Sequence, residues 1–341
     1  RKFKGRGELM TTTKVAVDFS SVERMLPVLE CLAKGESPAY EEVSDLLATP
    51  GMRTWFQHVQ RYGGRLDEVI YRDILKSVLG ECDRRGHGVD WLRKNLHRSD
   101  AMRRVLTELQ QLDLNVLCDQ AYALANKHLT EPFAEPVNLY FMCSTRGSTI
   151  VYDRTMVMDI ADFEDPAQQP LPIDYILSTF AHEVFHMGRD KILAHRPEPT
   201  GAGVRLIHQL LGMLWEEGIA TYLFSQPFSQ QQDGWFGIWD DPDPTVDTVV
   251  EIIEQAWAGS PDEAGLMRRI MGLFGLEGYV LGTRMCQAIA DVLGRGGLDQ
   301  CAASHYCFPA VYNLAVDQGV LGLPKFPEEV ASRLMEIDPA R

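Results

Sequence analysis

The chain has 341 residues, of which 45% are hydrophobic and 24% charged, a composition typical of a globular protein with one large domain or two ordinary ones. Its formal net charge of -15 argues against a nucleic-acid partner, because phosphate binding needs a surface rich in lysine and arginine. No apolar run approaches the roughly 20 residues that a membrane-spanning helix requires, so we expect no membrane span.

The amino-terminal end and the cysteines bear on the origin and location of the protein. Residues 1–9 are basic and precede Met10, so we interpret them as an expression remnant. The 7 cysteines are odd in number and scattered, and no Cys-x-x-Cys pair occurs. This pattern favours a reducing cytoplasm, and it indicates buried or idle thiols rather than a thiolate zinc site.

Residues 17–131 are predicted to form helices joined by short loops. Apolar residues recur at spacings of three and four, as in Val22, Met25 and Leu29, and glycine and proline separate the segments. We therefore predict a helical N-terminal lobe over 10–131.

A strand-rich region follows and opens a second part, 132–341. Segments 137–143, 148–152 and 155–160 are rich in valine, isoleucine, tyrosine and threonine, and turn-like Arg146–Gly147 and Asp153–Arg154 separate them. They predict a small antiparallel sheet over 137–160. Helical spacing then returns in segments near 172–187, 203–224, 245–258, 264–273, 277–294, 308–317 and 327–336, with loops near 197–203 and 226–244. The fold class is therefore α+β and mostly helical.

The most informative feature is His182-Glu183-Val184-Phe185-His186, an HExxH motif. In a helix, residues four apart lie on the same face, so both imidazoles can bind one ion. The flanking sequence has helical spacing, with one apolar arc formed by Ile173, Ile176, Leu177, Phe180, Ala181, Val184 and Phe185. We predict that His182 and His186 bind Zn²⁺ and that Glu183, beside the metal, takes a proton from the zinc-bound water. The alternative is a chance spacing on a solvated helix face.

A third ligand would decide between these alternatives, and Glu217 is the candidate. On a helical wheel it falls within an apolar stripe, whereas the neighbouring Glu216 falls on the polar side with a simple explanation as a surface residue. The stripe consists of Leu206, Leu210, Leu214 and Thr221. An inward carboxylate is costly to bury, and a bound cation removes that cost. The alternative for Glu217 is a buried salt bridge to an arginine.

The other histidines are weaker candidates as ligands. His208 lies away from the stripe that contains Glu217, and His195 follows a predicted loop. The remaining ones, which have no ligand-like spacing, are His58, His87, His97, His128 and His305.

Together these motifs resemble the gluzincin metallopeptidases, in which two histidines of HExxH and a glutamate from a following helix bind zinc. The local match is to the aminopeptidase N and leukotriene A4 hydrolase group, whose third ligand lies in a similar Trp-x-x-Glu-Gly-x-Ala stretch, here 214–220. The resemblance places that ligand at Glu217. It extends over 140–295, and it suits equally the uncharacterised bacterial proteins described as zinc-dependent proteases.

The same group has a Tyr-x-x-Gly element whose tyrosine stabilises the oxyanion, and Tyr279-Val280-Leu281-Gly282 is similar to it. The resemblance therefore implies that Tyr279 is a catalytic hydrogen-bond donor. The alternative is a core aromatic residue, in which case Tyr306 or Tyr312 is the next donor to consider. Two features depart from the group: the interval between His186 and Glu217 is longer, and no GxMEN-like segment precedes HExxH.

The resemblance implies a gluzincin-like catalytic domain in which the small sheet lies over the HExxH helix and its edge strand, 155–160, pairs with an extended substrate. We expect a zinc-dependent hydrolase, most simply a peptidase, that acts on a peptide or a small-molecule amide or ester. One alternative is a zinc hydrolase of a non-peptide amide, ester or epoxide. Another is a catalytically silent metal-binding scaffold, against which the intact Glu183 argues.

Overall fold

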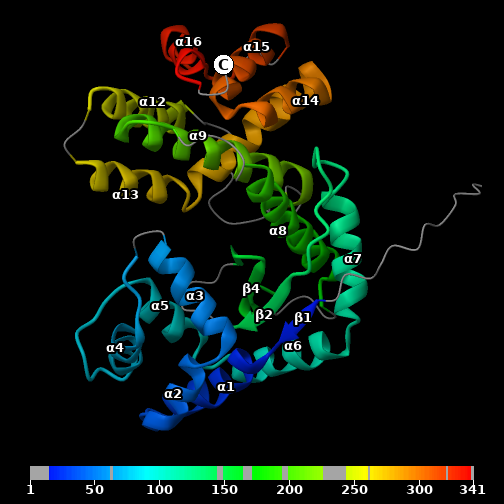
Figure 1. The fold of residues 1–341 in the computed structure, drawn as a ribbon. Coiled ribbons are helices and arrows are strands. Elements are labelled where there is room, and N and C mark those ends of the chain that lie inside the picture. Colours follow the sequence, from blue (N-terminus) through cyan, green and yellow to red (C-terminus); the bar gives the residue numbers. More distant parts are fainter. Residues whose placement is uncertain are drawn as a thin grey trace, which may run out of the picture. The chain divides into compact units, whose positions relative to one another are not determined.

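The structure, a computed structural model, describes residues 15–61, 64–143, 149–163, 171–193, 199–225, 243–259, 262–319 and 322–338. It divides into two compact units, Arg1–Arg189 and Asp190–Arg341. The described residues are mostly helical, with one small sheet, so the α+β, mostly helical fold class is confirmed (Figure 1). No helix in these ranges is long and apolar enough to cross a membrane. The division into 10–131 and 132–341 stays a prediction.

The helices of the first unit follow the apolar spacing of the sequence. Val22, Met25 and Leu29 are fully buried on one face of the first helix, as their spacing predicts. The helices are α1 (Ser20–Ala33), α2 (Tyr40–Leu47), α3 (Pro50–Arg61), α4 (Glu68–Val78), α5 (His87–Asn95), α6 (Ser99–Gln111), α7 (Leu114–Ala125) and α8 (Ile173–Leu193). The basic segment 1–9 lies outside the described residues.

The sheet of this unit is mixed rather than antiparallel. Its strands are β1 (Ala16–Asp18), β2 (Asn138–Met142), β3 (Ile150–Tyr152) and β4 (Thr155–Asp159), in the order β1-β2-β4-β3. β2 pairs in parallel with both β1 and β4, and only β3 and β4 run antiparallel. The expectation of an antiparallel sheet was therefore wrong for two of the three pairings. β1 was not predicted at all, because three residues are too short to carry a strand pattern.

The hairpin between β3 and β4 decides which strand lies at the edge. Asp153 and Arg154 form its two-residue loop, and both have positive φ angles, 42° and 58°, as in the type I′ turn that suits a tight hairpin. The hairpin places β4 between β2 and β3, so that Val157 pairs with Tyr140 on one side and Ile150 on the other. The prediction of an edge strand at 155–160 was therefore wrong. The other predicted turn, at 146–147, lies outside the described residues.

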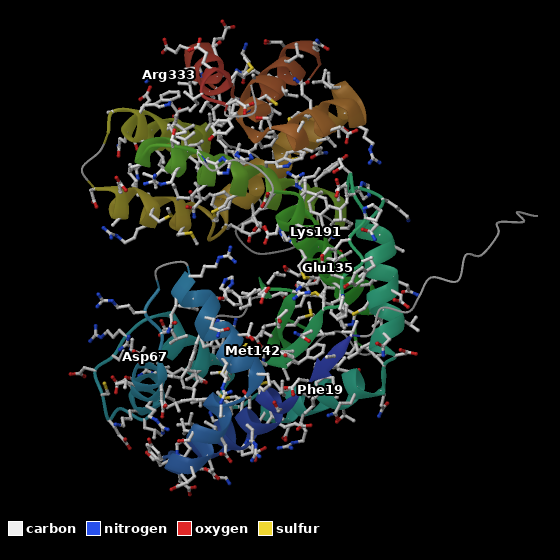
Figure 2. All side chains as sticks on the ribbon, in the orientation of Figure 1. Phe19, Asp67, Glu135, Met142, Lys191 and Arg333 are labelled. Atoms are coloured by element: carbon white, nitrogen blue, oxygen red, sulfur yellow. The ribbon has the colours of Figure 1, made fainter. Side chains whose placement is uncertain are left out.

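The side chains of β4 are also buried, in addition to its pairing on both sides. All five of its residues are buried, which is typical of a strand that is covered on both faces. Helices α1 and α3 pack against β2, and Phe19, just before α1, stacks on Phe141 with ring centroids 4.8 Å apart. Met142, the last residue of β2, is also buried, with 1% of its surface exposed; it is labelled with Phe19 in Figure 2.

The second unit has only helical elements among its described residues, and each segment predicted there corresponds to one of them, while 295–303 and 305–307 are helical beyond the prediction. The elements are α9 (Ala202–Ala220), continued by the π-helical turn η2 (Thr221–Ser225), then α12 (Asp243–Trp257), α13 (Glu263–Leu273), α14 (Glu277–Ala303), η3 (His305–Cys307), α15 (Phe308–Gln318) and α16 (Glu328–Glu336). α14 breaks at Gly294, where the sequence predicted its end and where φ is 65°. Most of the predicted loop 226–244 lies outside the described residues.

Helix α9 is the axis of this unit. α14 packs along it more extensively than any other pair of elements in the described residues, and α12 and α13 also contact it (Figure 1). Arg333 of α16, labelled in Figure 2, lies over the ring of Trp257 of α12 with its guanidinium carbon 4.2 Å from the ring centroid, so these two helices of the unit also contact one another. Residues on α9 are therefore held by neighbours on several sides.

Candidate metal centre

The HExxH motif lies within helix α8, as its chemistry requires. Ile176, Phe180 and Val184 on the apolar arc are completely buried, whereas His182 and His186 on the other arc are half-buried. One arc therefore packs and the other presents the imidazoles. This arrangement confirms the predicted phase of the helix.

The two imidazoles converge on one another. The Nε2 atoms of His182 and His186 lie 2.9 Å apart, and the ring centroids lie 4.7 Å apart. Two nitrogens bound to one tetrahedral zinc ion, each at about 2.0–2.1 Å from it, would lie about 3.3 Å apart. A small opening of this pair therefore gives the spacing that zinc needs.

Glu183 is more enclosed than the histidines beside it, with only 8% of its surface exposed. A carboxylate in such a place has little water around it, and this strengthens its interaction with any nearby positive charge or proton donor. Glu183 follows His182 directly, which is the position of the general base, rather than of a ligand, in an HExxH motif.

Helix α9 supplies the third candidate. Leu206, Leu210 and Leu214 are at most 5% exposed, and the half-buried Glu217 continues their stripe, as the helical wheel predicted. The prediction for Glu216 was less accurate. It is not a plain surface residue, because it is half-buried and one of its carboxylate oxygens is inaccessible to solvent.

One ligand atom from each of His182, His186 and Glu217 lies within 4.8 Å of the other two, so this group could hold a metal ion. Among the described residues, no other group of three histidine, cysteine, aspartate or glutamate side chains meets this criterion. Two imidazoles and one carboxylate are the donor set of catalytic zinc sites that keep the fourth position for water. The residues present therefore fit a zinc ion.

Tyr279 lies at the start of α14 and is half-buried, with its ring 6.1 Å from that of Phe274 in an edge-to-face arrangement. Its ring packs as expected for a helix aromatic, and the role of its hydroxyl as an oxyanion donor stays a prediction. The two alternative donors have other partners. The hydroxyl of Tyr312 donates to the carbonyl of Pro324 at 2.9 Å, and that of Tyr306 lies 3.2 Å from Nδ1 of His208.

A feature that the sequence analysis missed is the contact between the backbones of α9 and α14. A Cβ atom built on Gly218 would lie 2.6 Å from the carbonyl oxygen of Gly282, and one built on Gly282 would lie 3.0 Å from Cα of Gly218. Gly218 follows Glu217, and Gly282 is the glycine of the Tyr-x-x-Gly element. The signal in the sequence that could have indicated this crossing is the glycine in each of two motifs, the stretch with Glu217 and the Tyr-x-x-Gly element.

The other candidate ligands lie elsewhere. His208 and His305 contact one another, with Nδ1 of the first 3.1 Å from Nε2 of the second, and His195 lies outside the described residues. The cysteines in the described part of the chain form no disulfide. Burial raises the pKa of the Cys143 and Cys286 thiols well above the usual value, so these two are poor thiolate ligands.

Comparison with known proteins agrees with this geometry. Residues 43–319, which include the HExxH motif, the stretch with Glu217 and the Tyr-x-x-Gly element, match the family described as "Putative zinc dependent peptidase (DUF5700)". No curated protein and no solved structure matches the chain.

Proposed function

We propose that the chain, which belongs to the DUF5700 family, is a zinc-dependent hydrolase that cleaves peptides. The proposal rests on the description of that family and on the grouping of His182, His186 and Glu217. The observation that carries the proposal is the approach of three donor atoms to within 4.8 Å of one another. A buried salt bridge, the alternative for Glu217, does not account for two imidazoles at the same place.

The three ligands would hold zinc and leave one position open. A zinc ion bound there would act as a Lewis acid, which lowers the pKa of a bound water to about 7 and polarises a substrate carbonyl. The enclosed Glu183 carboxylate accepts the proton of the attacking water and can return it to the leaving amine. Its low exposure, 8%, keeps competing water away from this transfer.

Tyr279 completes the proposed machinery as a hydrogen-bond donor to the developing oxyanion. The support is its place in a Tyr-x-x-Gly element whose glycine contacts the residue after Glu217. A donor held before the reaction begins costs no reorganisation when charge develops. The gluzincin-like assignment rests on these motif resemblances.

A zinc hydrolase of a non-peptide amide, ester or epoxide would use the same groups, because the site activates water for any electrophile. The family description favours peptides over these substrates. A catalytically silent scaffold would need the ligands but not Glu183. A cytoplasmic location, expected from the cysteine pattern, stays a prediction.

Metal analysis together with a peptide-library digest read by mass spectrometry tests the proposal. We expect one zinc ion per chain and cleavage products that disappear on chelation and return with zinc. Glu183→Gln is the matched control, because it should keep the metal and lose the cleavage. Zinc binding without cleavage of any peptide would favour the non-peptide hydrolase or the silent scaffold, and no zinc at all would refute all three.

A further inference from the structure

We propose that Gly218 and Gly282 are positioning residues, whose backbone contact fixes Glu217 and Tyr279 relative to one another; the inference rests on the proposed function. Both glycines lie in the second compact unit, on α9 and α14. They are buried, and α9 and α14 form the most extensive contact between elements in the described chain.

The crossing leaves no room for a side chain on either helix. A Cβ on Gly218 would lie 2.6 Å from the carbonyl oxygen and 2.7 Å from Cα of Gly282. A Cβ on Gly282 would meet the carbonyl oxygen of Leu214, one helical turn before Gly218, and would lie 3.0 Å from Cα of Gly218. These neighbours are backbone atoms and cannot rotate away, so any larger residue must separate the helices.

The position of the crossing connects it to the site. On α9, Glu217 immediately precedes Gly218, and on α14, Tyr279 lies three residues before Gly282, on the same face. The proposed metal ligand and the proposed oxyanion donor therefore flank the same point of contact. Packed helices move as rigid bodies, so the crossing sets the separation of both functional groups.

The magnitude of the effect follows from the distances. An ordinary contact between carbon atoms needs about 3.5 Å, so one methyl group at this crossing moves the helices apart by roughly 1 Å. A misplacement of about 1 Å can reduce turnover by about 10²-fold. We therefore expect Gly282→Ala to lower kcat by about that factor, and Gly218→Ala to weaken zinc binding by at least about tenfold, the lower end of the usual loss when a group that orients a ligand is changed.

Two other glycines of the same helices provide matched controls. Gly203 of α9 is equally tight, since its Cβ would meet the backbone of Ala256, with the carbonyl carbon at 3.0 Å, but it lies near the other end of the helix from Glu217. Gly296 of α14 has open space where a Cβ would lie, with nothing outside the backbone of its own helical turn and its chain neighbours within 4 Å of that position. Gly203→Ala should lower the Tm without affecting zinc affinity or kcat, and Gly296→Ala should leave zinc affinity and kcat unchanged and should not lower the Tm, because alanine suits a helix better than glycine.

The experiment measures Tm, zinc affinity by competition with a chelator, and kcat for these four variants. It also includes the double variant Gly282→Ala with Tyr279→Phe. If Gly282 acts by positioning Tyr279, the double variant should lose no more turnover than Tyr279→Phe alone. If Gly282 is merely structural, the fold-losses in kcat of the two single variants should multiply in the double variant. Wild-type zinc affinity and kcat in folded Gly218→Ala and Gly282→Ala, or equal losses in Gly203→Ala, would overturn the inference.

A measurement on the wild-type protein tests the inference even if the glycine variants do not fold. Amide hydrogen exchange with and without zinc should show segments 214–218 and 279–283 gaining protection together, because the ligand and the crossing form one unit. Protection gained at 214–218 alone would overturn the inference. A chain that binds no zinc would instead refute the proposed function, and this result is distinct from a zinc-binding chain whose crossing does not matter.

Discussion

Two pairs of histidines in this molecule approach one another almost equally closely, yet their surroundings differ. Nε2 of His182 lies 2.9 Å from Nε2 of His186, and Nδ1 of His208 lies 3.1 Å from Nε2 of His305. The first pair has the carboxylate of Glu217 within reach and is half-buried. The second pair has a tyrosine hydroxyl beside it, and His305 is only 3% exposed. A short distance between imidazoles is therefore not sufficient to identify a metal site.

The third group decides between a ligand set and a hydrogen-bond network. An ionised carboxylate brings a negative charge, and together with two imidazole nitrogens it forms the donor set of a catalytic zinc site. A phenol both donates and accepts. Burial, with a contribution from Asp338, raises the pKa of Tyr306 to about 12, so its hydroxyl stays protonated and serves the second pair as a neutral partner. We infer a metal centre at the first pair and a structural network at the second.

Removing the carboxylate from the first pair should have the largest effect. Glu217→Gln keeps the shape but loses the charge, so zinc affinity should fall by more than about 100-fold, beyond the usual cost of losing a supporting hydrogen bond to a ligand. Turnover should fall with it. Glu216→Gln is the control and should bind zinc normally. The reverse pattern, measured by chelator competition, would show that the phase of α9 is wrong.

Removing the base should have the next largest effect. Glu183→Gln should retain zinc with unchanged affinity, because this residue is not a ligand, while kcat falls by about 10²–10⁴-fold. Metal content and turnover are measured on the same preparation. Loss of the metal in this variant would identify Glu183 as a ligand and would contradict its assignment as the general base.

The two tyrosines sharpen the comparison further. Tyr279→Phe removes only a hydroxyl, so zinc content and folding should be unchanged while kcat falls by about 10²–10³-fold and KM moves little. Tyr306→Phe removes the partner of the second pair and should leave kcat as it is. A near-wild-type kcat in Tyr279→Phe would identify Tyr279 as a packing residue.

Changes at the second pair should affect stability alone. His208→Asn or His305→Asn breaks a buried hydrogen-bond network, so the free energy of unfolding should fall by about 1–3 kcal/mol. Denaturant unfolding measures this change. Turnover of the folded protein at low temperature should match the wild type, and a selective loss of activity would connect this network to the site.

The sequence predicted those parts that depend on local periodicity. The burial of the apolar stripes of α8 and α9 and the turn at Asp153–Arg154 follow from spacings within one segment. The sheet was predicted less well, because the pairing of β4 with β2 depends on contacts between distant segments. The crossing of Gly218 and Gly282 was missed for the same reason, since a close approach of two helices leaves no period in either one.

Counting metal ions per chain tests the central claim most directly. We expect one zinc ion in the wild type, none in His182→Ala or His186→Ala, and one in His208→Asn, because among the described residues the first pair alone has a carboxylate as its third donor. Elemental analysis of the four proteins after dialysis, each shown to be folded by circular dichroism, gives the count. Full zinc retention in both alanine variants, or loss of the ion in His208→Asn, would contradict the assignment of the metal to His182, His186 and Glu217.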